Sequence, residues 1–298
     1  MIFVQNYTSH RSALVKLLLL AGIIGLFCAC SSAPPEQDYA EDYRANLQYV
    51  TGKPYQHAVY VNSAAFAIQT NEQQTDQPEP LLHVYIEGDG KAFDQGKVTT
   101  NPTPDNPLLL KLMAKDNQPA IYLGRPCYFN PSDDLCSPNV WTRQRYSQQV
   151  VTSMAGALQQ FSQPYRGIVL IGHSGGGTLA ALMAAQVPHT KMLVTLAGNL
   201  DTFAWAVEHN YQPLKASLNP TDQPPLPEHI IQVHYAGADD AVIDPDWVQA
   251  FAEKQQRAEF HRLLAVNHID GWEEFWPQVL DKLEHYQQVV ESKPKPQR

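Results

Sequence analysis

Basic residues are scarce in this sequence, and several features that would identify a protein class are missing. Its 298 residues hold 21 lysines and arginines against 30 aspartates and glutamates, a formal net charge of −9. Because a protein that binds a nucleic-acid backbone needs a basic surface, we expect no nucleic-acid partner. No internal repeat with a period of about 20–50 residues is present, which excludes solenoids and propellers. The composition is 44% hydrophobic, which favours a folded globular chain over a disordered one.

Long hydrophobic runs are also missing, and the most apolar one lies near the N-terminus. Residues 17–29 (LLLLAGIIGLFCA), at about 1.5 Å per residue, are shorter than the about 30 Å hydrocarbon core of a bilayer. Arg11 and Lys16 precede this run, and the first acidic residue is Glu36. A basic start followed by a short apolar run predicts a secretory signal peptide over residues 1–29.

The end of this run resembles the lipobox of bacterial lipoproteins, in which a leucine, two small residues and a cysteine mark the cleavage and lipidation point. Residues 26–31 read Leu-Phe-Cys-Ala-Cys-Ser, with Phe27 where leucine is usual. The resemblance implies that Cys30 is acylated and that Ser31 directs the protein to the outer membrane, facing the periplasm. Acyl chains would anchor it to the bacterial cell envelope without a spanning helix. An ordinary cleaved signal and a retained signal anchor are the alternatives.

Cysteines are few as well. Cys28 belongs to the signal, so Cys127 and Cys136 are the pair left for the folded part. In an oxidising periplasm this pair predicts a disulfide. The segment between them is rich in turn residues and offers too few ligands for a metal site.

Short apolar runs alternate with longer amphipathic ones through the rest of the chain, which predicts an α/β fold with a mostly parallel, twisted sheet and helices on both faces. We expect a tether over residues 30–54, one domain over residues 55–290 and a flexible tail over residues 291–298. The expected strands cover residues 57–67, 81–87, 120–123, 167–171, 191–197, 230–236 and 260–266, the first as an antiparallel edge. The expected helices cover residues 107–115, 143–161, 177–186, 245–255 and 272–290, with Asn106–Pro107 and Asp244–Pro245 as cap signals.

The most informative segment is the apolar run 167–171 followed by Gly172-His173-Ser174-Gly175-Gly176 and an alanine-rich helix. This is the G-x-S-x-G pattern in the strand–turn–helix context that it requires. A serine on such a tight turn projects its hydroxyl above the sheet edge, next to the positive end of a helix. A phosphate-binding turn is the alternative, but no P-loop lysine follows and no dinucleotide-binding glycine spacing fits.

At this point the sequence resembles the α/β-hydrolase superfamily, over nearly all of residues 55–290. The resemblance implies a triad in the order Ser, acid, His, without a metal or cofactor. The acid falls on Asp240, in the loop after the strand 230–236, with Asp239 and Asp244 as alternatives. The base falls on His268, in the loop after the last strand, where it would take the proton of Ser174.

The same resemblance implies two oxyanion-hole donors, the backbone N–H of Gly175 and that of Asp89, with Gly90 as the close alternative. Many family members have histidine where this chain has Glu87. Two carboxylates near an oxyanion would oppose it unless they point away and bind loop backbone. If they instead face the cleft, we expect a preference for neutral or cationic substrates.

Further short segments resemble bacterial hydrolase-like lipoproteins with no settled substrate. They are Glu87-Gly-Asp-Gly90, Arg125-Pro-Cys127, the glycines at 175–177 and Ala197-Gly-Asn-Leu-Asp201. The leading hypothesis is a serine hydrolase (esterase, thioesterase or lipase-like) that acts on a small-molecule ester through an acyl-enzyme. A catalytically silent hydrolase-fold binding lipoprotein and an acyltransferase with the same triad are the alternatives. The residues between positions 197 and 230 have room for a small lid over the site.

Overall fold

A computed structural model describes residues 39–70, 79–129 and 133–291, which belong to a single unit. The predicted signal peptide, Cys30 and residues 292–298 of the expected tail lie outside the described residues, whereas Glu291, also expected in the tail, is the last residue of the C-terminal helix. Among the helices of the described part, none combines the length and the apolar character that a bilayer crossing requires.

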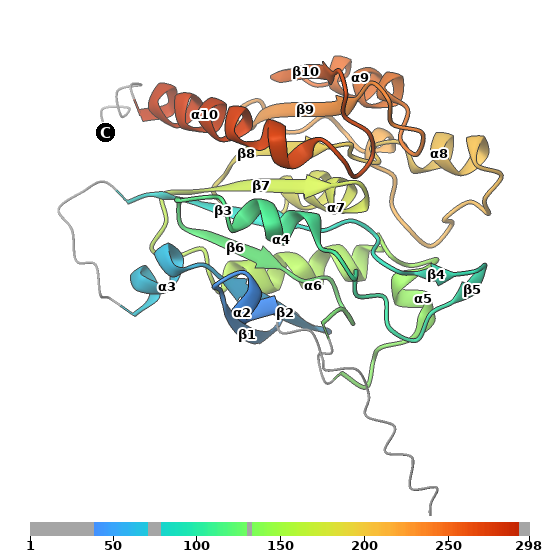
Figure 1. The fold of residues 1–298 in the computed structure, drawn as a ribbon, viewed down its shortest axis with the longest axis horizontal. Helices are drawn as coiled ribbons and strands as arrows, with labels where there is room; N and C mark the ends of the chain where they lie inside the picture. Colours follow the sequence, from blue (N-terminus) through green and yellow to red (C-terminus); the bar gives the residue numbers. More distant parts are fainter. Residues whose placement is uncertain (1–38, 71–78, 130–132, 292–298) are drawn as a thin grey trace, which may run out of the picture. The chain divides into compact units, whose positions relative to one another are not determined.

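An eight-stranded sheet forms the centre of this unit, in the order β1-β2-β6-β3-β7-β8-β9-β10 (Figure 1). The strands are β1 (Asn46–Thr51), β2 (Gln56–Val61), β3 (Leu81–Ile86), β6 (Ala120–Leu123), β7 (Gly167–His173), β8 (Thr190–Leu196), β9 (Ile231–Gly237) and β10 (Ala258–Leu263). Strand β2 runs antiparallel to β1 and to β6, and every other neighbouring pair is parallel. The predicted mostly parallel α/β sheet is thereby confirmed.

Helices cover both faces of the sheet. Figure 1 shows α4 and α10 on the near face, whereas α6 and α7 lie behind the strands. The helices are α2 (Tyr39–Asp42), α3 (Ser63–Gln69), α4 (Leu108–Met113), α5 (Pro138–Trp141), α6 (Gln148–Gln159), α7 (Gly175–Ala184), α8 (Thr202–Glu208), α9 (Pro245–Glu253) and α10 (Trp272–Glu291). A small hairpin of β4 (Phe93–Asp94) and β5 (Lys97–Val98) and a short 3-10 helix (Pro220–Asp222) lie in the loops.

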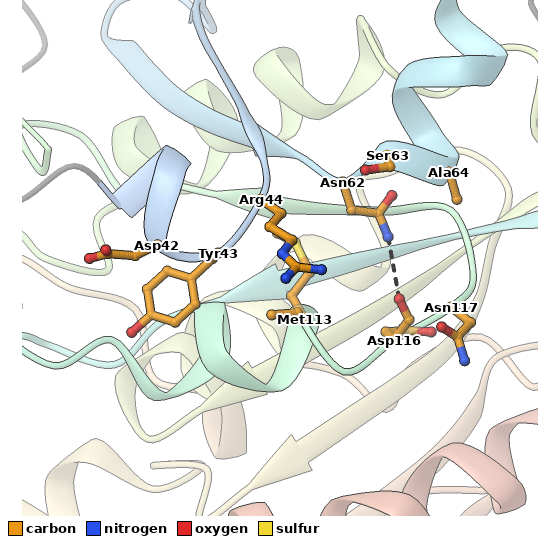
Figure 2. A pocket seen from close by; sticks show the side chains of 10 residues that line it. Asp42, Tyr43, Arg44, Asn62, Ser63, Ala64, Met113, Asp116 and Asn117 are labelled. Atoms are coloured by element: carbon orange, nitrogen blue, oxygen red, sulfur yellow. Dashed lines mark hydrogen bonds between the residues drawn. The ribbon is translucent and has the colours of Figure 1, made fainter.

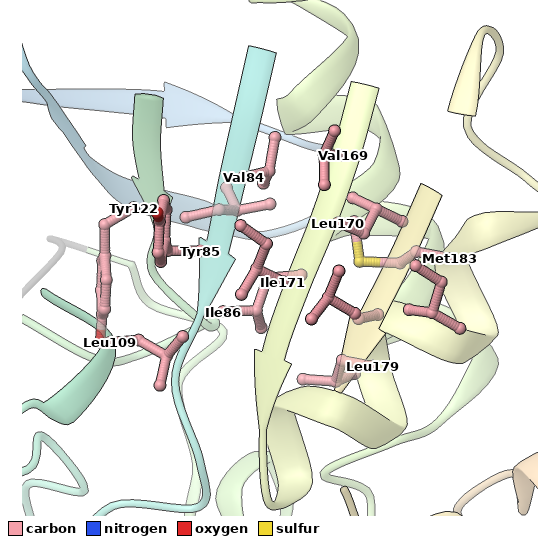
Figure 3. Packing of buried hydrophobic residues seen from close by; sticks show 14 of the residues in the cluster. Val84, Tyr85, Ile86, Leu109, Tyr122, Val169, Leu170, Ile171, Leu179 and Met183 are labelled. Atoms are coloured by element: carbon pink, nitrogen blue, oxygen red, sulfur yellow. The ribbon is translucent and has the colours of Figure 1, made fainter. Parts of the chain in front are cut away.

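The core explains why the central strands read as continuous apolar runs. Every residue of β3 and β7 is buried, because helices cover both sides of these strands. Figure 3 shows Leu170 of β7 beside Met183 of α7, and both side chains are fully buried. This packing fixes the carboxyl ends of the strands, where the loops with the candidate site residues begin.

The N-terminal boundary of the domain needs a correction. Residues 46–51, expected in the tether, form β1, which pairs along its whole length with β2. An edge strand with one solvated face carries polar residues, and that polarity made this segment read as a linker. The segment 57–67, expected as one strand, ends as β2 at Val61, and α3 begins after Asn62, whose side chain accepts from the N–H of Ala65 at 2.9 Å. An apolar run does not by itself distinguish strand from helix.

Two expected helix starts also differ from the structure. The helix predicted over 143–161 begins only after Ser147, whose hydroxyl accepts from the N–H of Val150. The Asn106–Pro107 cap signal is wrong, because Pro107 is the N-cap and no local side chain caps α4. The Asp244–Pro245 signal is confirmed, with the carboxylate of Asp244 accepting from the N–H of Asp246.

A disulfide joins Cys127 to Cys136, as expected from the sequence. It links the loop that follows β6 to the segment that precedes α5. The bridge therefore restrains the loop that follows β6, which holds Arg125 and Tyr128.

Candidate active site

Ser174 lies on the turn between β7 and α7, at the carboxyl edge of the sheet. Its backbone has φ 52° and ψ −122°, a conformation that side-chain-bearing residues rarely adopt. Two flanking glycines make the turn possible. A Cβ at Gly172 would lie 2.3 Å from the carbonyl oxygen of Gly176, and a Cβ at Gly176 would lie 2.0 Å from that of Ile86. Neither position has room for a side chain, so the pattern G-x-S-x-G follows from the close approach of β7, α7 and β3.

His268 connects Ser174 to a carboxylate. Its Nε2 lies 3.1 Å from Oγ of Ser174, and its Nδ1 lies 2.9 Å from Oδ2 of Asp240. The other carboxylate oxygen of Asp240 accepts from the N–H groups of Val242 and Ile243 at 2.8 and 2.9 Å. The structure therefore brings together Ser174, Asp240 and His268 from three loops of the sheet edge.

The environment of Asp240 keeps it ionised. Its side chain is fully buried, which raises its pKa, but the hydrogen bond and charge of His268 and the two backbone donors outweigh burial, so the pKa lies below its ordinary value. Of the three acids weighed from the sequence, Asp240 is the one whose carboxylate bonds to His268. Asp244 caps α9, and the N–H of Asp239 donates to the carbonyl of Val266.

The backbone carbonyl of His268 is held by two side chains, those of Trp272 and His173. Nε1 of Trp272 donates to the carbonyl of His268 at 3.2 Å, and Nε2 of His173 lies 2.7 Å from the same oxygen. Because a carbonyl only accepts, His173 carries its proton on Nε2. Burial lowers the pKa of His173 to about 3, so it stays neutral. The position of His173 inside the G-x-S-x-G pattern was the signal that could have indicated this role.

Glu87 points away from the nucleophile and caps a helix. Its Oε2 accepts from the N–H of Leu109 in the first turn of α4 at 2.8 Å, and its Oε1 accepts from the N–H of Gly88 at 3.2 Å. Burial raises the pKa of Glu87 to about 7, against the opposing effect of these two donors and of Arg125. The cap that α4 lacks locally is thus supplied by a residue 22 positions earlier in the chain.

Asp89 is enclosed by cations and a phenol. Arg125 Nη1 and Arg145 Nη1 each approach one carboxylate oxygen at 2.6 Å, and the hydroxyl of Tyr146 donates to the same group at 2.7–2.8 Å. Burial raises the pKa of Asp89, but the two guanidiniums and the hydrogen bonds hold it well below its ordinary value. Together with the cap made by Glu87, these contacts remove the physical basis for expecting cationic substrates. The two carboxylates have structural partners.

The predicted oxyanion donors lie beside Ser174. A Cβ at Gly88 would lie 3.3 Å from Cβ of Ser174, so the peptide that carries the N–H of Asp89 adjoins the nucleophile. Gly175 begins α7 directly after Ser174. Within the described part of the chain, no hydrogen bond from the N–H of Asp89 or of Gly175 is present. Gly90, the alternative, has φ 58° and packs against the carbonyl of Pro102.

A separate hollow of about 380 Å³ lies among α2, the start of α3 and the end of α4 (Figure 2). Its lining is largely polar and includes Asp42, Arg44, Asn62 and Asp116, and the amide of Asn62 donates to the carbonyl of Asp116. The described residues that line it include no histidine and no cysteine. The described residues also contain no cluster of three or more His, Cys, Asp or Glu side chains arranged to hold a metal ion.

The fold is that of the α/β hydrolases, as comparison with solved structures shows. No family model matches the sequence, and no curated protein matches it. The esterase Est1E from Butyrivibrio proteoclasticus with ferulic acid bound is similar with a TM-score of 0.59 and 11% identity, covering 81% of this chain and 99% of that one. An esterase from Pyrococcus furiosus gives 0.58 and 10%, covering 85% and 96%. The 2-hydroxy-6-oxo-6-phenylhexa-2,4-dienoate hydrolase from a Rhodococcus strain gives 0.51 and 11%, covering 80% and 99%.

Proposed function

We propose that this protein, which has the α/β-hydrolase fold, is a serine hydrolase that cleaves small-molecule carboxylic esters. The observation that carries the proposal is the hydrogen-bonded series from Ser174 Oγ through His268 to Asp240, at 3.1 and 2.9 Å. The esterases among its structural neighbours support an ester substrate. In this proposal Ser174 is the nucleophile, His268 the base and Asp240 the acid of the triad.

In the proposed reaction, Oγ of Ser174 attacks the ester carbonyl carbon while its proton passes to Nε2 of His268. The buried carboxylate of Asp240 orients the imidazole and stabilises the imidazolium that forms. His268 then gives the proton to the leaving alcohol, which departs as the acyl-enzyme forms. A water molecule, activated by the same histidine, releases the carboxylic acid and restores the serine.

The negative charge of the tetrahedral intermediate needs donors at the carbonyl oxygen. The N–H groups of Gly175 and Asp89 are the candidates, because both adjoin Ser174 and neither has a partner within the described part of the chain. The N-terminus of α7 adds positive partial charge at the same place.

Labelling with a fluorophosphonate and hydrolysis of short p-nitrophenyl esters test this function in wild type and Ser174→Ala. We expect the variant to take up no label and to lose several orders of magnitude in kcat, because the nucleophile is gone. Ser162→Ala is the matched control, since that exposed hydroxyl donates only to the carbonyl of Gln159 and should leave both readouts unchanged. Labelling or hydrolysis that survives in Ser174→Ala would overturn the assignment.

We further propose that the enzyme is anchored in the bacterial envelope through acylated Cys30, at the outer membrane facing the periplasm. The sequence of residues 26–31 supports this, as does a disulfide between the cysteines of the folded domain. Cys30→Ser should abolish incorporation of labelled palmitate and move the protein to the soluble fraction. A wild-type chain that carries no lipid would contradict the anchor and leave the hydrolase assignment untouched.

A further inference from the structure

Arg125 binds the loop that follows β3 at the peptide that adjoins the nucleophile. Its Nη1 donates to the carbonyl of Gly88 at 2.9 Å and to Oδ1 of Asp89 at 2.6 Å. The side chain is only 2% exposed, and it enters from the loop directly after β6, the strand beside β3. A buried guanidinium in this place is costly unless its donors are used, and here they bind loop backbone and a carboxylate.

The bond to the carbonyl of Gly88 sets the direction of the N–H of Asp89. Both groups belong to one trans peptide unit, in which C=O and N–H point in opposite directions. A donor that fixes the carbonyl on one side therefore fixes the N–H on the other. Gly88 lies against Ser174, so this peptide unit adjoins the nucleophile.

The remaining acceptors of Asp89 are held as well. The hydroxyl of Tyr128 donates to its carbonyl at 2.9 Å, while Arg145 and Tyr146 bind its carboxylate. Among the described residues, the N–H of Asp89 is thus the polar group of this residue without a hydrogen-bond partner. Two guanidiniums beside one carboxylate also leave a net positive charge behind the peptide.

We propose that Arg125 is a positioning residue of the oxyanion site: it holds the Gly88–Asp89 peptide so that the N–H of Asp89 faces the oxygen on which charge develops. This inference rests on the proposed serine-hydrolase function. The action is through the backbone, since Arg125 donates to the Gly88 carbonyl and the Asp89 carboxylate, and among the described residues no hydrogen bond joins it to Ser174 or His268. Arg145, in contrast, donates to the Asp89 carboxylate, and among the described residues it makes no hydrogen bond to the Gly88 carbonyl.

A comparison of Arg125→Gln with Arg145→Gln separates the positioning of the Gly88–Asp89 peptide from the loss of a positive charge. Each variant removes one guanidinium from the same carboxylate, but only Arg125→Gln removes the donor to Gly88. The readout is kcat and KM for a p-nitrophenyl ester and for the matching thionoester, whose sulfur accepts hydrogen bonds weakly. We expect Arg125→Gln to lower kcat for the ester about 10²-fold at nearly unchanged KM, in the range seen when an oxyanion donor is lost. The ester-to-thionoester rate ratio should fall at least about tenfold, as expected when such a donor is misdirected.

Arg145→Gln should keep that rate ratio and lose less than about tenfold in kcat, because the donor stays in place. Equal losses in the two variants, or an unchanged ratio in Arg125→Gln, would overturn the positioning role. Thermal unfolding checks that the variants are folded. If Arg125→Gln does not fold, Arg125→Lys, which keeps the charge but shortens the side chain, takes its place in the same ratio measurement. Fluorophosphonate labelling of Ser174 in each variant keeps a failure of this inference distinct from a failure of the proposed function.

Discussion

The buried carboxyl of Glu87 should make the stability of this protein fall as pH rises from about 4.5 to neutrality. Its pKa is about 7 in the folded protein against 4.5 for an ordinary glutamate, chiefly because burial disfavours the charged form. Below pH 4.5 the group is protonated in both states, and its contribution to stability is fully present. Between the two pKa values the native protein holds a proton that the unfolded chain has lost.

The magnitude follows from this difference in bound protons. In that window the free energy of unfolding decreases by about 1.4 kcal/mol for each pH unit. Across the interval from the ordinary to the folded pKa, the loss adds up to about 3 kcal/mol, most of it complete by pH 7. Because Glu87 caps α4 and contacts the loop of Gly88, the weakened part is the element beside the candidate oxyanion site.

Urea unfolding of wild type and Glu87→Gln at pH values from 4.5 to 8.5 measures this effect. The amide is neutral throughout, so the difference in unfolding free energy between the two proteins should change by about 3 kcal/mol in favour of the variant as pH rises. The contributions of all other titratable groups to the unfolding free energy cancel in this difference. Glu273→Gln is the control, because the hydrogen bond and charge of Lys115 lower the pKa of Glu273. The stability that Glu273 contributes is therefore lost as pH falls, whereas that of Glu87 is lost as pH rises. A flat difference curve for Glu87→Gln would refute the reasoning.

Other variants test the candidate site and its turn. Asp240→Asn should lower kcat about 10⁴-fold with little change in KM, since an amide stabilises the wrong tautomer of His268; steady-state kinetics checks this, and a loss below tenfold would contradict the role of Asp240. Gly176→Ala should destabilise the fold by about 3 kcal/mol, because its Cβ would lie 2.0 Å from a backbone oxygen that cannot move aside. Gly96→Ala, where a Cβ meets nothing within 4 Å but φ is 77°, should cost only about 1 kcal/mol in the same urea titration.

Local patterns determined much of the fold. The central strands read as buried because helices cover both of their faces, and the turn at Ser174 was visible because strand, turn and helix are consecutive in the chain. The cap at Asp244 is likewise a contact between near neighbours. Features at the edge of the sheet were harder to predict from the sequence. Strand β1 is polar because its outer side is solvated, and its pairing with β2 joins residues that no local pattern connects.

The sequence by itself identified Ser174, Asp240 and His268 as the proposed triad, because each follows a strand in the order that the α/β-hydrolase resemblance implies. Only the tertiary structure decided how their surroundings act. From the sequence, Glu87 and Asp89 could either face the cleft or bind loop backbone; in the structure one caps α4 and the other lies between Arg125 and Arg145. These partners come from 22 to 56 residues away in the chain. The charge and direction of a side chain at a sheet edge depend on which loops converge there, and that convergence is set by strand order rather than by neighbouring residues.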